Sequence, residues 1–210
     1  MNQLRLLPPE KARAKARASV RKFQLEKKRK EFEAKRQGSD DLHVRLQAAA
    51  GEGKKEEVER LLRAGADPDF RNRFGETALF YAAGSGWDEV IELLIEHGAD
   101  IRAIDSGGVT PLMRAVGYGH TAAARVLVDA GSDVNAIDDY HKVPVMFAAN
   151  FGSAEHAIES IKILLDAGAN INAKAMAMNG EEKTALDVAT QTLTKEFLVS
   201  RGAKRAEELK

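Results

Sequence analysis

The chain has 210 residues, with 32 Lys and Arg against 32 Asp and Glu, and 44% of its residues are hydrophobic. It holds no cysteine, which excludes disulfides and cysteine-ligated zinc, and no apolar run approaches the roughly 20 residues that cross a bilayer. The N-terminus lacks the long apolar segment of a secretory signal. We therefore expect a cytoplasmic protein, with a nuclear or organellar location as the alternative in a eukaryote.

The first 38 residues form a strongly basic segment. They hold 13 Lys and Arg against 4 Asp and Glu, a net charge of +9, whereas residues 39–210 hold 19 against 28, a net charge of −9. Strong helix formers dominate residues 10–36, so we predict a long basic helix there. Four interpretations stay open: a solvated extension, a surface that binds an acidic protein or the chain's own acidic body, a nucleic-acid-binding arm, and a mitochondrial-type presequence.

From about residue 40 onward the sequence repeats itself. A Gly-Ala or Gly-Ser pair ends successive segments at intervals of 33, 33, 37 and 34 residues, starting at Gly65, Gly98, Gly131, Gly168 and Gly202. Before each pair stands an apolar segment such as "VERLLRAGAD", whose Val58, Leu61 and Leu62 have helical spacing. Self-similarity of this length is typical of repeat architectures, in which each unit packs only on its neighbours.

A second landmark marks the start of a shorter helix in each unit. "TALFYAA" begins at Thr77, "TPLMRAV" at Thr110, "VPVMFAA" at Val143 and "TALDVAT" at Thr184. We predict that the threonines cap these helices and that Pro111 and Pro144 lie in the first turn, where a missing N–H costs nothing. The glycines that follow are predicted to turn the chain into the second helix.

The stretch "GVTPLMRAVGYGH" contains a Gly-x-Gly, Gly117–Gly119, of the kind found in phosphate-binding loops. A dinucleotide loop needs a third glycine three residues later and a buried strand before it, and neither is present. Equivalent pairs stand 33 residues apart at Gly51–Gly53 and Gly84–Gly86, which indicates a scaffold role. No histidine forms an i, i+4 pair with another metal ligand, so we expect no metal, no cofactor and no catalytic residues.

These landmarks in register resemble the ankyrin repeat, a unit of about 33 residues with a β-hairpin turn, Thr-Pro-Leu-His, two alanines, Gly-His and a second helix. The resemblance covers residues ~40–204 and is strongest in "ETALFYAAGSGWDEVIELLIEHGADIRAID" and "GVTPLMRAVGYGHTAAARVLVDAGSDVNAID". It implies an all-α repeat solenoid, an ankyrin-type helix-turn-helix stack with β-hairpin loops. We place this domain at residues 39–204, after the basic extension of residues 1–38 and before a charged tail of residues 205–210.

Five units are predicted, at residues ~40–72, 73–105, 106–138, 139–174 and 175–204. The family histidine after Thr-Pro-Leu is replaced by Phe80, Met113, Met146 and Asp187, and we expect the three apolar residues to substitute packing for polar links between units. About four extra residues near "SAEHAIES", and about four more in "AKAMAMNGEEK", are expected in loops on the binding side. His141 replaces the hairpin glycine of the fourth unit, whose tip is expected to be irregular.

In the ankyrin family, partners are held by the hairpin tips and the exposed side of the first helix. Carried over position by position, the predicted partner-binding residues are Arg73, Phe74, Glu76, Ser85, Ser106, Val109, Tyr118, Asp139, Tyr140, Lys142, Asn150 and Phe151. We take Tyr118 and Phe151 as equivalent positions of neighbouring units, and aromatic residues often dominate binding energy. Trp87, in the place of the family's Gly-His histidine, is expected to pack within the scaffold.

The sequence thus favours a non-catalytic, monomeric module that binds a protein partner through its hairpin tips and concave groove. The acidic body would favour basic partners. One alternative is a nucleic-acid-associated adaptor, whose basic arm contacts RNA or DNA while the stack binds protein. Another is self-regulation, in which the +9 arm lies on the −9 body and competes with the partner.

Overall fold

The computed structural model describes residues 41–176 and 180–209. The basic helix predicted over residues 10–36, and each interpretation of it, lie outside these residues. Residues 42–210 make one compact unit. None of the described helices has the length and apolar character needed to span a membrane.

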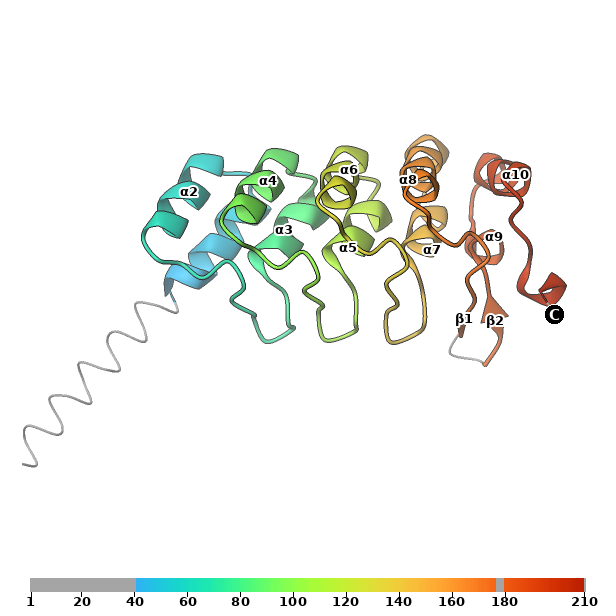
Figure 1. Cartoon of the computed structure of the whole chain (residues 1–210), viewed down its shortest axis with the longest axis horizontal. Helices are drawn as coiled ribbons and strands as arrows, with labels where there is room; N and C mark the ends of the chain where they lie inside the picture. The colour runs from blue at the N-terminus through green and yellow to red at the C-terminus, as the bar shows by residue number, and fades with distance from the viewer. Residues whose placement is uncertain (1–40, 177–179, 210) are drawn as a thin grey trace, which may run out of the picture. The chain divides into compact units, whose positions relative to one another are not determined.

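Two rows of helices and a row of hairpin loops make up this unit (Figure 1). The first helices of successive pairs are residues 41–51, α3 (Ala78–Ser85), α5 (Pro111–Gly117), α7 (Pro144–Ala149) and α9 (Ala185–Val188). The second helices are α2 (Lys55–Arg63), α4 (Asp88–Glu96), α6 (Thr121–Asp129), α8 (Ala154–Asp166) and α10 (Thr192–Ser200). Because α3 packs on α5, α5 on α7 and α7 on α9, the predicted all-α helix-turn-helix stack is confirmed.

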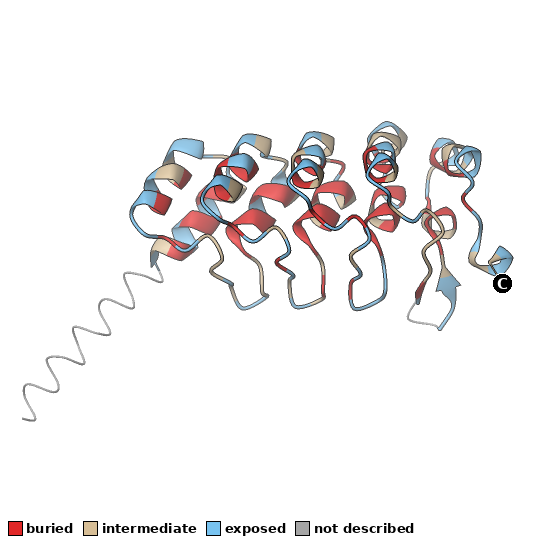
Figure 2. Ribbon diagram, viewed as in Figure 1, coloured by how far each residue is buried: buried red, intermediate tan, exposed pale blue. Residues whose placement is uncertain are grey.

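The core lies between the two rows, where Figure 2 shows the buried residues, while the loop tips are exposed. Leu46, Leu79 and Leu112, each 33 residues from the next, are fully buried, and each contributes roughly 1.5–3 kcal/mol by leaving water. The alanine pair Ala82 and Ala83 is also fully buried. Side chains this small let the first helices approach one another closely.

Backbone capping starts the first helices, although not in the same way in each unit. The Thr110 hydroxyl accepts a hydrogen bond from the Met113 N–H at 3.2 Å, and Pro111 occupies the first turn of α5, as predicted. Thr77 is the N-cap residue of α3, but its hydroxyl is buried without a hydrogen-bond partner among the described residues. Thr77 therefore has the backbone position predicted for an N-cap residue, but its side chain makes no capping hydrogen bond.

The turn between the two helices of a unit holds an aromatic ring against a glycine of the preceding unit. These ring–glycine contacts are Trp87 on Gly53, His120 on Gly86 and Phe151 on Gly119. All three glycines have a positive φ, which side-chain-bearing residues rarely adopt, and a Cβ on any of them would overlap the ring. Trp87 Nε1 also donates to Gly51 O at 2.9 Å, and His120 Nε2 lies 3.1 Å from Gly84 O. The Gly-x-Gly pairs are therefore part of the scaffold.

Three hairpin loops, which we call the finger loops (residues 71–76, 104–109 and 137–142), share one hydrogen-bonding pattern. In each, an Asn or Asp side chain accepts the N–H groups two and four residues later: Asn72, Asp105 and Asp138. Neighbouring loops are joined by backbone bonds, from Ser106 N to Phe74 O at 2.8 Å and from Asp139 N to Gly107 O at 3.0 Å. The loops are thus fixed relative to one another.

The tip of the fourth unit is regular, so the irregular tip predicted there is wrong. His141 has a φ of 60°, close to the values of Gly75 and Gly108 at the same position in the preceding loops. The His141 N–H donates to Asp138 O at 2.9 Å, as the Gly108 N–H donates to Asp105 O. The Asp138 carboxylate makes the same turn as its counterparts, and this turn holds His141 in the left-handed conformation despite its side chain.

The two predicted insertions differ in their structure. The four extra residues of the fourth unit lengthen α8 to 13 residues, compared with 9 in α4 and in α6, so the loop predicted there is wrong. Ala157, Ile161 and Leu164 keep the spacing of a buried helical face through the added turn, which is why the helix continues. The longer link to the fifth unit contains the hairpin β1 (Ala175–Met176) and β2 (Glu182–Lys183).

The positions of the family histidine show both packing and hydrogen bonding. Phe80, Met113 and Met146 are buried, as expected for apolar replacements. Gln47 occupies the same place in the first unit and donates to Phe70 O at 3.0 Å and Glu76 O at 2.9 Å, so a polar link to the next unit persists there. This link was not predicted from the sequence.

Asp187, in the same place of the fifth unit, ties the C-terminal segment to α9. It accepts hydrogen bonds from the backbone N–H groups of Thr184 and Ala206, both at 2.9 Å, and it forms an ion pair with Arg205 at 3.3 Å. Burial alone raises the pKa of Asp187, but these hydrogen bonds, the Thr184 hydroxyl and Arg205 outweigh it and lower the pKa below its usual value. The 3₁₀ turn Ala206–Glu208 is thereby attached to the stack.

Candidate protein-binding surface

The exposed side of the first helices carries three adjoining hollows, which together we call the groove. The first hollow is lined by Glu76, Phe80, Tyr81, Gly84, Ser85, Arg114 and Tyr118. The second is lined by Val109, Met113, Arg114, Gly117, Tyr118 and Phe147. The third is lined by Gly117, Lys142, Met146, Phe147, Asn150 and Val188. Adjacent hollows share two residues, so the groove is continuous from α3 to α9.

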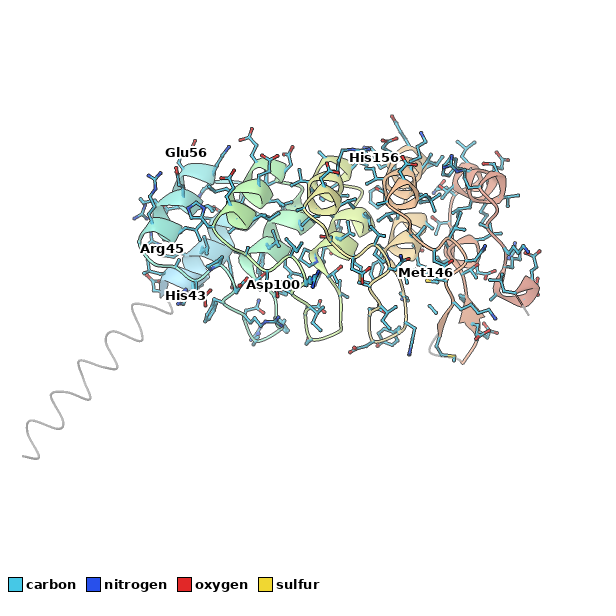
Figure 3. The ribbon with its side chains drawn as sticks, viewed as in Figure 1. His43, Arg45, Glu56, Asp100, Met146 and His156 are labelled. Carbon is cyan, nitrogen blue, oxygen red and sulfur yellow. The ribbon has the colours of Figure 1, made fainter. Side chains whose placement is uncertain are left out.

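One helix position per unit lines this groove. This position directly follows Phe80, Met113, Met146 and Asp187 in successive units. It is occupied by Tyr81, Arg114, Phe147 and Val188. Figure 3 shows Met146 on the row of first helices near the loops, whereas Glu56 and His156 lie at the opposite edge. The repeat thus places one variable side chain per unit along the groove.

A polar network forms one wall of the first hollow. Arg114 Nη2 lies 2.8 Å from Glu76 Oε1 and 3.2 Å from Asp105 Oδ2. The Tyr81 hydroxyl donates to Glu76 Oε2 at 3.2 Å, and Asn72 Nδ2 donates to the same oxygen at 3.0 Å. Burial, followed by the charge of Glu76 and the hydrogen bond to it, raises the pKa of Tyr81 above its usual value of 10.0. Both carboxylate oxygens of Glu76 therefore already have partners within the protein.

The second hollow is the most apolar part of the groove, with a volume of about 390 Å³. Tyr118, 53% exposed, and Phe147 stand on its two sides. Gly117 lies between them and presents no side chain, and a Cβ there would lie 3.5 Å from Phe147 Cδ1. A cavity lined mainly by apolar and aromatic groups is suited to an apolar side chain of a ligand.

The third hollow has a polar rim. Lys142 comes from the finger loop of the fourth unit, and its Nζ lies 5.5 Å from the centre of the Tyr140 ring. Asn150, at the end of α7, is exposed on the other side. Within residues 41–176 and 180–209, no carboxylate forms an ion pair with Lys142, and no Asp or Glu lines the second or third hollow.

The predicted partner-binding residues divide into three groups. Six line the groove: Glu76, Ser85, Val109, Tyr118, Lys142 and Asn150. Five lie exposed on the finger loops: Arg73, Phe74, Ser106, Asp139 and Tyr140. Phe74 is 50% exposed with the Arg73 guanidinium 4.6 Å from its ring centre, and Tyr140 is 45% exposed. Their role in binding stays a prediction.

Phe151 stands apart, because its ring makes the third ring–glycine contact. It packs on Gly119 and meets His156 edge-on, with 6.2 Å between ring centres. Tyr118 instead borders the groove, so the equivalence assumed between Tyr118 and Phe151 is wrong. The Phe151 ring packs on a glycine of the preceding unit as the rings of Trp87 and His120 do. Phe151 follows its glycine by 32 residues, whereas Trp87 and His120 each follow theirs by 34. The chain enters α8 differently, since ψ is 117° at its N-cap residue Ser153, compared with 79° at Trp87 and 78° at His120.

Sequence reasoning missed the residues that line the groove from within the first helices, chiefly Tyr81, Arg114 and Phe147. They stand 33 residues apart and directly precede the small residues of "YAA", "RAV" and "FAA". Aligning the units on their buried residues would have marked this position as variable in size and charge between buried neighbours. This variation in size and charge is the sequence signal that could have identified the groove-lining position.

Within the part of the chain that the structure describes, no group of three His, Asp or Glu side chains is placed to hold a metal ion. The expected absence of a metal, a cofactor and catalytic residues stays a prediction.

Comparison with known proteins identifies the repeat. Residues 46–138 match a family model described as ankyrin repeats in three copies. No curated protein matches the chain. Ankyrin repeats generally mediate protein–protein interactions and typically have no catalytic activity. The stacked helix pairs, the glycine turns and the finger loops agree with this match, and residues 46–138 of the chain are ankyrin repeats.

Proposed function

We propose that the chain binds a partner protein, without catalysis, through the groove and the finger loops. The observation that carries this proposal is the continuous groove from α3 to α9 with exposed aromatic side chains along it. Tyr118 stands between the first and second hollows and lies near the middle of this surface. A large, partly exposed aromatic residue in a central position is typical of residues that dominate the energy of an interface.

The rigidity of the surface supports the proposal. The ring–glycine contacts join the first four units to one another, and backbone bonds join the finger loops to one another. The Arg114 network fixes the wall of the first hollow. A surface that is already ordered loses little conformational entropy when it binds, so more of its contact energy contributes to affinity.

The finger loops extend the surface beyond the groove. Phe74 and Tyr140 expose half or nearly half of their area at two loop tips, each beside a cation, Arg73 or Lys142. These side chains are placed to contact a partner that lies along the groove. We expect them to add contact area at the edge of the interface and to contribute less energy than Tyr118.

Site-specific photo-cross-linking tests the proposal. A benzophenone amino acid is introduced at Tyr118 in the full chain, or at Val199, which is 59% exposed on α10 and away from the groove. We expect a protein adduct from position 118 that disappears when Gly117→Leu fills the adjoining hollows. Equal adducts from both positions, or an adduct that persists with Gly117→Leu, would count against the groove as the binding site.

A further inference from the structure

The electrostatic character of the groove differs from that of the rest of the repeat domain. Residues 39–210 carry a net charge of −9, yet no carboxylate lines the second or third hollow among the described residues. The charged groups that line these two hollows are Arg114 and Lys142. A charge in the lining of the groove lies closer to a bound ligand than the other surface charges do, so its interaction with the ligand is stronger and is screened less than theirs.

Arg114 and Lys142 are not equivalent within this lining. Arg114 is neutralised by Glu76 and Asp105 and has a structural role. Lys142 has no carboxylate partner within the described residues, and its side chain lies at the rim beside Asn150. Lys142 is therefore the cation that remains available to a ligand in the groove.

The two hollows are adjacent, since Gly117 and Phe147 line both of them. An apolar side chain between Tyr118 and Phe147 would thus sit next to the site that Lys142 borders. Resting on the proposed protein-binding function, we propose that the occupant is a partner segment that inserts one large apolar side chain into the second hollow. In this proposal an Asp or Glu close to that side chain in the partner's sequence pairs with Lys142. The chemistry of the groove thus selects an apolar and acidic segment, the opposite of the basic partner expected from net charge.

The same charges argue against the chain's own basic segment as the occupant. Residues 1–38 carry 13 Lys and Arg against 4 Asp and Glu, so they would bring like charge to Lys142. A like-charge contact at an interface is unfavourable and selects against that ligand.

Peptide selection on the full chain tests this inference. A random 12-residue library displayed on phage is selected against the immobilised protein, and enriched sequences are synthesised for affinity measurement by fluorescence polarisation. We expect enriched peptides to place Trp, Phe, Leu or Met within a few residues of Asp or Glu. Their affinity should fall as NaCl rises from 50 to 500 mM, because the Lys142 contact is at the rim and is screened.

Two variants with matched controls assign the contacts. Gly117 lies in α5 without a positive φ, so Gly117→Leu adds a side chain that fills both hollows, and we expect peptide binding to fall more than tenfold. Lys142→Glu should weaken the acidic peptides roughly tenfold at low salt, and selection against it should enrich basic peptides instead. Lys204→Glu and Leu193→Ala, at exposed positions outside the groove, should leave affinity unchanged. Tyr118→Ala replaces Gly117→Leu if the latter fails to fold.

The outcomes separate this inference from the proposed function. Peptides that bind in the groove but are neutral or basic, or are insensitive to Lys142→Glu, overturn the acidic and apolar assignment and leave the proposed function in place. A selection that enriches no peptide also overturns the assignment. Peptides that are insensitive to both Gly117→Leu and Tyr118→Ala, or adducts from position 118 that persist with Gly117→Leu, overturn the proposed function itself.

Discussion

The ring–glycine contacts and the groove are both built from large side chains that recur with the repeat, but they do opposite things. Trp87, His120 and Phe151 each cover a glycine of the preceding unit. Tyr118 and Phe147 border hollows that the protein leaves open. The three rings that cover a positive-φ glycine of the preceding unit hold units together, whereas Tyr118, which is more than half exposed, is free to meet a ligand.

The largest effect expected from this comparison is on the glycines. Gly119→Ala should lower the free energy of unfolding by about 3 kcal/mol, because an alanine there is strained at φ +75° and its Cβ also overlaps Phe151. Gly131→Ala is the matched control, since φ is +92° but no atom lies within 4 Å, and about 1 kcal/mol is expected from strain alone. Urea unfolding followed by circular dichroism measures both. Equal losses would show that the ring contact does not matter.

The second prediction separates the two aromatic residues that sequence position alone made equivalent. Phe151→Ala should lower the free energy of unfolding by about 2 kcal/mol, because a half-buried ring leaves Gly119 uncovered. Tyr118→Ala should change it by less than about 0.5 kcal/mol, because more than half of this side chain is exposed. For binding we expect the reverse order, with Tyr118→Ala the more damaging in an affinity assay. The same order in both assays would contradict the distinction.

The third prediction concerns the wall of the groove. Arg114→Ala should cost about 1 kcal/mol of stability, because the Glu76 and Asp105 side chains, 19% and 11% exposed, lose their shared cation. Arg63→Ala is the control, because its pair with Glu59 on α2 is exposed and is expected to contribute only a few tenths of a kcal/mol. Thermal and urea unfolding measure the two variants. A cost for Arg63→Ala as large as that for Arg114→Ala would mean that the groove network has no special role.

The smallest effect is the titration of Tyr81 in the same network. Its pKa lies above 10.0, so the neutral hydroxyl is favoured in the folded protein, and this contribution is complete below pH 10 and lost as pH rises through the folded-state pKa. Glu76→Gln should lower the Tyr81 pKa, because it removes the negative charge beside the phenol. The Tyr81 ring signals in a high-pH NMR titration report it, with Glu92→Gln on α4 as the control. An unchanged Tyr81 pKa in Glu76→Gln would refute the contribution of Glu76.

Several local features followed from sequence because each depends on one element of the repeat. The cap at Thr110, the first-turn Pro111 and the scaffold role of Gly119 are examples. The predicted loops near "SAEHAIES" failed because an insertion of about one helical turn keeps the apolar face in register and can extend a helix as readily as a loop. The irregular tip at His141 failed because the Asp138 side chain, together with the left-handed conformation that His141 adopts, supplies the turn.

The sequence by itself determined the repeat period, the helix pairs and the finger loops, because periodic apolar residues, caps and glycines act over a few residues each. Only the tertiary structure decided which large side chains remain open to a partner. That depends on the residue one unit away: Gly119 lies beneath Phe151, whereas Gly117, Tyr118 and Phe147 line a hollow together. It also decided that Glu76 is held by Arg114, 38 residues along the chain, while Lys142 stays available at the rim. Contacts between units set these outcomes, and no pattern within one unit contains them.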